Sequence, residues 1–116
     1  MIAIVCRSSY LASTMSAMLC GERSMWFGTD DTLPDPRRRL SEALVKNRVS
    51  VVFYEPSFFV DPAPYRTMSP STRFVILAGP GEESSGRDAL AFGAAAMLAK
   101  PVDTGAVNGV FQLVSV

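Results

Sequence analysis

The 116-residue sequence has no histidine, two cysteines and a formal net charge of zero, and each feature excludes a class of function. Without histidine the chain cannot build Ser-His-Asp or Cys-His catalytic groups, or the usual zinc sites. Two thiols, Cys6 and Cys20, are too few for a four-thiolate metal centre, and sparse cysteine is typical of the reducing cytoplasm. We therefore expect a cytoplasmic protein with no metal and no cofactor.

Long apolar runs and charge of one sign are also missing. No apolar run approaches the ~20 residues that a membrane span needs, and the amino terminus lacks the layout of a signal peptide. We therefore expect no membrane association. Eleven basic and eleven acidic side chains balance, which argues against direct nucleic-acid binding. What the chain does have is 48% apolar residues, enough for one domain, residues 1–116, with its own core.

Short apolar runs alternate with helical patterns along the whole chain. Near-continuous apolar runs, typical of strands buried on both faces, cover 1–6, 49–54 and 74–78. Weaker strand patterns cover 24–29 and 95–99. Five strand-helix units in series predict an α/β domain with a parallel sheet covered by helices on both faces.

Capping and turn residues place the helices between these strands. Prolines at 56, 62, 64 and 70 predict that any third helix is short or broken, and Gly93 should end the fourth. On the second helix, we expect the buried side to comprise Leu40, Ala43, Leu44 and Val45. The expected caps are Ser8 or Ser9 for the first helix, Asp35 followed by Pro36 for the second, and Ser84 or Ser85 for the fourth.

In a parallel sheet, ligands bind at the carboxyl ends of the strands. The residues at those ends are the candidates for a functional site: Cys6, Arg7, Thr29 to Asp31, Glu55, Ala78, Gly79 and Lys100. Asp30 and Asp31 are either a stray metal-binding pair or turn residues. Arg37-Arg38-Arg39 marks either a partner contact or a solvated helix face.

Segment 91–103, AFGAAAMLAKPVD, has a Gly-Ala turn, a short strand and then Lys100-Pro101. It is similar to the junction of helix 4 and strand 5 in the receiver domains of two-component response regulators. Ser41-Glu42-Ala43-Leu44, eleven residues ahead of Glu55, resembles the helix that precedes strand 3 of that family. The resemblance spans essentially the whole chain and implies a flavodoxin-like (βα)5 three-layer sandwich with a central five-stranded parallel sheet. It also implies a cis bond before Pro101, which is affordable only before proline.

Most of the residues that carry the family's chemistry are changed in this chain. Receiver domains hold Mg²⁺ with an acidic pair after strand 1, where this chain has Cys6 and Arg7. A thiol and a guanidinium cannot replace the oxygen ligands of a hard cation. The remaining family positions match Glu55 for the phosphoacceptor Asp, Ala78 for the Ser or Thr of strand 4, Met97 for the aromatic switch, and Lys100 with Pro101, which are retained.

Three roles for Glu55 stay open: a fixed charge paired with Lys100 or Arg7, a non-standard phosphoacceptor, or a polar residue without a role. The Arg7 guanidinium either takes over the charge of the metal ion or is solvated. Cys6 offers a rival reading as a reactive thiol in a phosphoryl carrier. Against that reading, the loop after Cys6 lacks the glycine that phosphate loops need, and Cys6 also fits as buried apolar filler.

The resemblance therefore implies an atypical receiver domain in signal transduction that is not an enzyme and has lost Mg²⁺-dependent phosphorylation. We expect it to act by contact with a partner protein or a fused output module, or as a homodimer, and to be the N-terminal part of a longer regulatory protein. The first alternative is a working receiver in a phosphorelay that uses Glu55 or another non-standard acidic residue as phosphoacceptor, and the second is a phosphoryl carrier based on Cys6. In the family, such contacts use the last two helices and the last strand, which here include Leu90, Phe92, Met97, Val107, Val110 and Phe111.

Overall fold

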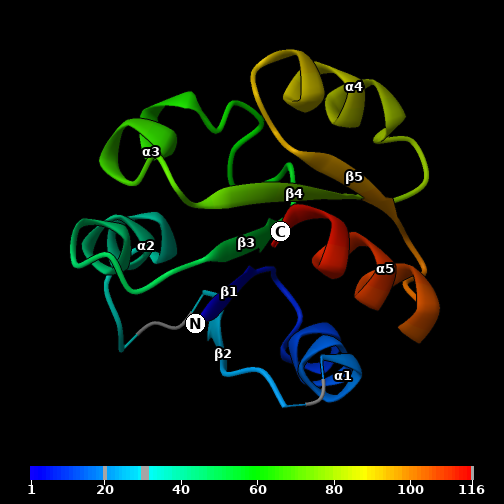
Figure 1. The fold of residues 1–116 in the computed structure, drawn as a ribbon, viewed down its shortest axis with the longest axis horizontal. Coiled ribbons are helices and arrows are strands. Elements are labelled where there is room, and N and C mark those ends of the chain that lie inside the picture. Colours follow the sequence, from blue (N-terminus) through cyan, green and yellow to red (C-terminus); the bar gives the residue numbers. More distant parts are fainter. Residues whose placement is uncertain (20, 30–31, 116) are drawn as a thin grey trace.

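A computed structural model describes residues 1–19, 21–29 and 32–115; the candidates Cys20, Asp30 and Asp31 lie outside the described residues. Strands and helices alternate throughout, as the sequence predicts (Figure 1). The elements are β1 (Ile2–Val5), α1 (Ser9–Met18), β2 (Ser24–Phe27), α2 (Pro36–Val45), β3 (Val51–Tyr54), α3 (Ala63–Met68), β4 (Arg73–Ala78), α4 (Glu83–Ala91), β5 (Ala96–Ala99) and α5 (Thr104–Val114).

The five strands form one parallel sheet in the order β2-β1-β3-β4-β5. Helices α1 and α5 cover one face, and α2, α3 and α4 cover the other (Figure 1). Alternate residues of the central strands feed two separate cores: Ile2 and Ile4 pack towards Met15 of α1, whereas Ala3 and Val5 pack on the opposite side. The predicted three-layer α/β sandwich is confirmed. No helix within the described ranges is long and apolar enough to cross a membrane.

Side-chain caps fix the starts of three helices. The Ser8 hydroxyl accepts the Leu11 N–H at 3.2 Å, and the Asp35 carboxylate accepts the Arg37 N–H at 2.8 Å. Asp103 caps α5 in the same way, at 2.9 Å from the Ala106 nitrogen. The expected caps Ser84 and Ser85 are wrong: both lie inside α4, which begins after Glu82 without a side-chain cap.

Two predictions about which side chains are buried or exposed also need correction. Val45 is 69% exposed at the end of α2, because the buried stripe of this short helix is limited to the i, i+4 pair Leu40 and Leu44 and the buried Pro36. Val107, expected on a contact face, is fully buried in the core between α5 and the sheet. Gly93 ends α4 as predicted, in the left-handed region at φ +111°.

The proline-rich segment after β3 is held by an aromatic cluster that the sequence pattern did not predict. Tyr54 stacks on Phe59 with 4.3 Å between ring centroids, and Phe59 contacts Tyr65 of the six-residue α3 at 4.4 Å. Phe74 of β4 meets these rings at 6.1 to 6.4 Å. The Tyr54 hydroxyl donates to the Val60 carbonyl at 3.0 Å. Ring packing therefore replaces the contacts that a longer third helix would make.

Candidate functional site

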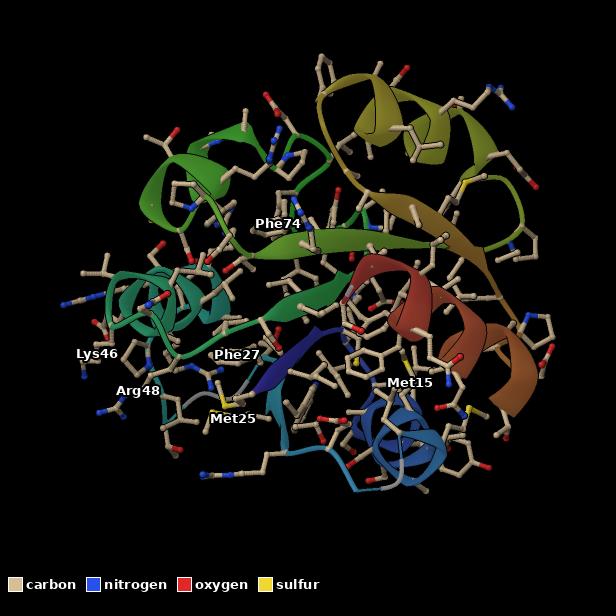
Figure 2. The ribbon with its side chains drawn as sticks, in the orientation of Figure 1. Met15, Met25, Phe27, Lys46, Arg48 and Phe74 are labelled. Carbon is tan, nitrogen blue, oxygen red and sulfur yellow. The ribbon has the colours of Figure 1, made fainter. Side chains whose placement is uncertain are left out.

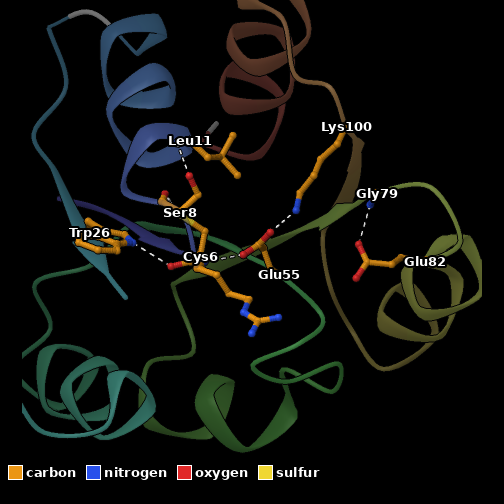
Figure 3. A network of polar contacts seen from close by, with 9 residues as sticks. Cys6, Ser8, Leu11, Trp26, Glu55, Gly79, Glu82 and Lys100 are labelled. Atoms are coloured by element: carbon orange, nitrogen blue, oxygen red, sulfur yellow. Dashed lines mark hydrogen bonds and ion pairs between the residues drawn. The ribbon is translucent and has the colours of Figure 1, made fainter. Parts of the chain in front are cut away.

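Glu55 lies at the carboxyl edge of the sheet, immediately after the central strand β3. Its backbone N–H donates to the Val5 carbonyl at 3.0 Å, which holds it beside the end of β1. The residue is 9% exposed. One carboxylate oxygen, Oε1, accepts the backbone N–H of Arg7 at 2.7 Å, and the other, Oε2, pairs with the Lys100 ammonium (Figure 3). Both carboxylate oxygens are thus engaged by groups of the protein itself.

Lys100 reaches Glu55 because β5 ends one residue earlier, two strands away from β3. The Lys100 N–H donates to the Ala78 carbonyl at 2.9 Å, which extends the β4–β5 pairing up to the site. The lysine stem crosses the end of β4 next to Gly79, where Cδ lies 3.6 Å from the position that a Cβ would occupy. The Lys100–Pro101 bond is cis, as the resemblance implied.

Arg7 touches Glu55 through its main chain and not through its guanidinium. Among the described residues, the ion pairs are Arg37–Asp35, Arg38–Glu42 and Lys100–Glu55, and the Arg7 side chain is exposed. The idea that the Arg7 guanidinium replaces the charge of a metal ion is therefore wrong for this arrangement. Lys100 is the residue that places a cation against the carboxylate.

Cys6 is fully buried, and its thiol donates to the Ser8 carbonyl at 3.2 Å. Burial, followed by the nearby negative charge of Glu55, raises the pKa of Cys6 to about 11. The backbone around it is fixed as well, because the Trp26 indole N–H donates to the Cys6 carbonyl at 2.8 Å (Figure 3). A thiol protonated at neutral pH is a poor nucleophile, so these contacts favour a packing role over a phosphoryl carrier.

We expect alkylation of Cys6 by iodoacetamide to be at least about 100-fold slower in the folded protein than in urea, since the raised pKa lowers the thiolate fraction by that factor. The rates are measured by intact mass at pH 8 in a Cys20→Ser background. Equal rates in both states would contradict the buried thiol. The raised pKa means that the folded state binds the Cys6 thiol proton more tightly than the unfolded state. The free energy of unfolding should therefore fall as the pH rises from about 9 towards 11.

The residues around Glu55 do not fit the magnesium ion that the family's chemistry uses. No three His, Cys, Asp or Glu side chains within the described ranges come close enough together to hold a metal ion. Cys6 and Arg7 supply no carboxylate oxygen. The nearby Glu82 turns back to accept the Gly79 N–H at 2.8 Å, a loop contact that the sequence did not reveal (Figure 3).

Ala78 and Met97 are the residues that the sequence resemblance matches to the strand 4 hydroxyl and the aromatic switch of receiver domains. Ala78 is buried at the end of β4 and has no hydroxyl to contact a phosphoryl group. Met97 is 38% exposed on β5, and its sulfur fills the space beside Gly86 of α4, where any Cβ would overlap it. Leu90 and Phe92 are exposed nearby, while Val110 and Phe111 are half-buried.

No protein-family model and no curated protein matches the chain, but solved structures do. The receiver domain of NtrX from Brucella abortus is 16% identical with a TM-score of 0.78, covering 99% of this chain and 98% of that one. The N-terminal receiver domain of a Bacteroides fragilis two-component response regulator is 14% identical with a TM-score of 0.80, covering 99% and 95%.

Longer proteins contain the same fold as one part. Full-length FixJ from B. japonicum is 14% identical to this chain with a TM-score of 0.76, and the match covers 97% of this chain and 56% of that one. Identities this low establish the arrangement of elements and not the chemistry of the site. The chain has the flavodoxin-like fold of the receiver domains of response regulators.

Proposed function

We propose that this domain is an atypical receiver module that works by protein contact and does not undergo Mg²⁺-dependent phosphorylation. The observation that supports it most strongly is the double engagement of Glu55, by the Lys100 ammonium and the Arg7 N–H. The position that would accept a phosphoryl group is already neutralised by a permanent partner. Such a domain holds one state and does not switch between two.

Phosphoryl transfer to a carboxylate needs a free oxygen to attack phosphorus and cations to neutralise the charge of the transferred group. At Glu55 each oxygen already accepts a hydrogen bond, and the Lys100 ammonium, its ion-pair partner among the described residues, is committed to the carboxylate. The additional methylene of Glu, relative to Asp, also displaces the carboxylate, and errors of about 1 Å can cost ~100-fold in rate. The site therefore supports a structural ion pair better than a transfer reaction.

The surface that supports protein contact consists of Leu90, Phe92 and Met97, on α4, its C-terminal turn and β5, here called the α4–β5 surface. These three side chains are 38 to 50% exposed and come from consecutive elements, and exposed apolar side chains favour docking where they form one patch. We propose that the occupant is a fused output module, a separate partner protein or a second copy of the chain. Full-length FixJ, which is nearly twice as long as the matched region, supports the fused arrangement.

Incubation with acetyl phosphate and Mg²⁺ followed by intact mass tests the loss of phosphorylation. We expect no gain of about 80 Da, the mass of one phosphoryl group. A variant combining Cys6→Asp, Arg7→Asp, Glu55→Asp and Ala78→Thr rebuilds the family's pattern and serves as the positive control. A gain in the unmodified protein that disappears with Glu55→Gln would contradict the proposal, and one that disappears with Cys6→Ser would establish the thiol carrier.

Replacing Leu90 and Phe92 together with Ser is expected to weaken self-association, or binding to a fused or separate partner, by at least about tenfold, because both lie in the α4–β5 surface. Sedimentation over a range of concentrations, or titration with the partner, measures it. Val45→Ser is the matched control, since Val45 is even more exposed but lies on α2. An unchanged affinity in the double variant would remove this surface from the proposal.

A further inference from the structure

We infer that a groove along the β2 edge of the sheet docks an acidic, extended segment of a partner protein. The groove has a volume of about 570 Å³ and lies between β2, α2 and the turn that precedes β3. The lining of this basic groove includes Arg23, Met25, Phe27, Arg39, Lys46 and Arg48. Neither the packing of the fold nor the contacts of Glu55 explain why these basic side chains line one groove.

The basic groove runs along the edge strand β2, from Arg23 directly before the strand to Phe27 at its carboxyl end. Arg23 directly precedes β2, and Arg48 lies shortly before β3, so both mark the amino ends of strands. Glu55 follows the carboxyl end of β3. Figure 2 shows Met25, Lys46 and Arg48 on the same side of the molecule, where α2 ends and β2 runs along the sheet. Arg23 and Arg48 therefore lie at the opposite ends of their strands from Glu55.

Charge in the groove is strongly one-sided although the whole chain is neutral. Four of the 11 basic residues line it, against one acidic residue, Glu42. Glu42 is itself paired with Arg38, at 3.5 Å. Within the part of the chain that the structure describes, the groove cations make no ion pair. Like charges around one hollow raise the local positive potential, which favours an anionic partner.

Arg39 is held in place by neutral groups, so its charge remains available. Its Nε donates to the Pro34 carbonyl at 3.1 Å, and its Nη2 donates to the Gly28 carbonyl. The guanidinium lies over the Phe27 ring, 5.8 Å from its centroid. A fixed guanidinium loses little conformational freedom when a carboxylate binds it. The groove is therefore pre-organised at this point.

An apolar contact lies among the cations. Met25 is 51% exposed on β2, which is one of the two edge strands of the sheet and pairs with β1 alone. A segment with alternating acidic and apolar side chains would pair with the cations and cover the Met25 thioether. Charge and shape thus favour a short acidic peptide stretch.

Nucleic acid and membranes fit the groove less well. Proteins that depend on phosphate contacts commonly make about 6–10 of them, whereas this groove offers four cations on a chain without net charge. Polybasic membrane sites use about 4–8 cations together with an apolar group that enters the lipid. Met25 alone offers little apolar surface for that purpose, which disfavours a membrane. A folded second copy would have to present acidic side chains to this groove. These three occupants are outcomes of the test below.

The test uses residues 1–116 and a fluorescein-labelled peptide of sequence EELEELE, with binding followed by fluorescence anisotropy at about 50 mM salt. We expect a dissociation constant on the order of 100 μM. Lys46→Glu and Arg48→Glu should each weaken binding at least about fivefold. Both side chains are exposed, so the fold should survive, which circular dichroism checks. Arg87→Glu, at a residue that is also exposed but lies on α4, is the matched control and should change affinity less than about twofold.

A charge exchange makes the test specific. The Lys46→Glu/Arg48→Glu double variant should lose EELEELE and gain binding to KKLKKLK, which the unmodified domain should not bind. Equal weakening by Arg87→Glu, or no binding at all, would overturn the inference. So would tighter binding to single-stranded DNA or to phosphatidylserine vesicles, or self-association that Arg48→Glu abolishes. The inference shares with the proposed function only the idea of protein contact, because its variants do not touch Glu55 and its failure leaves the phosphorylation result unchanged.

Discussion

Replacing Lys100 with Met is expected to lower the free energy of unfolding by about 2–3 kcal/mol, because the Glu55 carboxylate is then left without its cation. The carboxylate cannot turn to water easily, since the Glu55 side chain is 11% exposed and the Arg7 N–H holds one oxygen. The Lys100 side chain is 24% exposed, so partial solvation keeps the loss below that of a completely buried pair. Urea unfolding followed by circular dichroism measures the change.

Two further variants separate the loss of charge from the loss of lysine packing. Adding Glu55→Gln to Lys100→Met should recover most of the lost stability, since a neutral amide still accepts the Arg7 N–H and needs no cation. Lys100→Arg should cost less than Lys100→Met because it keeps a cation. A loss below about 0.5 kcal/mol with Lys100→Met would show that the pair behaves as a solvated surface pair. In that case the Glu55 carboxylate would not depend on Lys100, which would contradict the proposal that the domain holds one state.

Replacing Phe74 with Ala is expected to cost about 3–5 kcal/mol of folding free energy. Phe74 is 1% exposed and meets the rings of Tyr54, Phe59 and Tyr65, so its removal opens a cavity beneath the proline-rich segment. Thermal and urea unfolding report the loss. Hydrogen exchange across residues 57–68 should show the segment losing protection before the rest of the domain.

Phe74→Leu is the matched control for this cavity. It retains most of the buried volume and should cost less than about 1.5 kcal/mol. If both variants were equally unstable, aromatic geometry rather than filled volume would hold the segment. If Phe74→Ala remained nearly as stable as the original, the cluster would not support the fold.

Much of the fold could be predicted from the sequence because its signals are local. Buried parallel strands are apolar runs, and Asp35-Pro36 is a helix start whose chemistry involves only neighbouring residues. The carboxyl-edge position of Glu55 then follows from the alternation of strands and helices. Local signals were misleading at the start of α4. The Glu82 side chain accepts the Gly79 N–H, and the helix begins at Glu83, so neither Ser84 nor Ser85 is the cap.

The candidate site was less predictable because its contacts are long-range. Lys100 and Arg7 both qualify by charge as partners of Glu55, and composition cannot choose between a side-chain contact and a main-chain contact. The choice depends on the end of β5, which brings Lys100 across β4, and on the turn after β1, which presents the Arg7 N–H. The burial of Val107 and the exposure of Val45 depend equally on tertiary packing. The apolar character of a side chain does not by itself show whether the side chain is buried or exposed.

The place of β1 in the sheet has a consequence for how the chain folds. Of the five strands, β1 comes first along the chain, yet it lies between β2 and β3, with Ile2 beside both Ser24 and Val51. Its ladder closes only when a stretch of about fifty residues has looped back, an entropic cost that precedes the gain from pairing. We therefore expect refolding to be slower than that of a helical bundle of similar length, with the apolar β1 segment open to chaperones or to aggregation until β3 arrives.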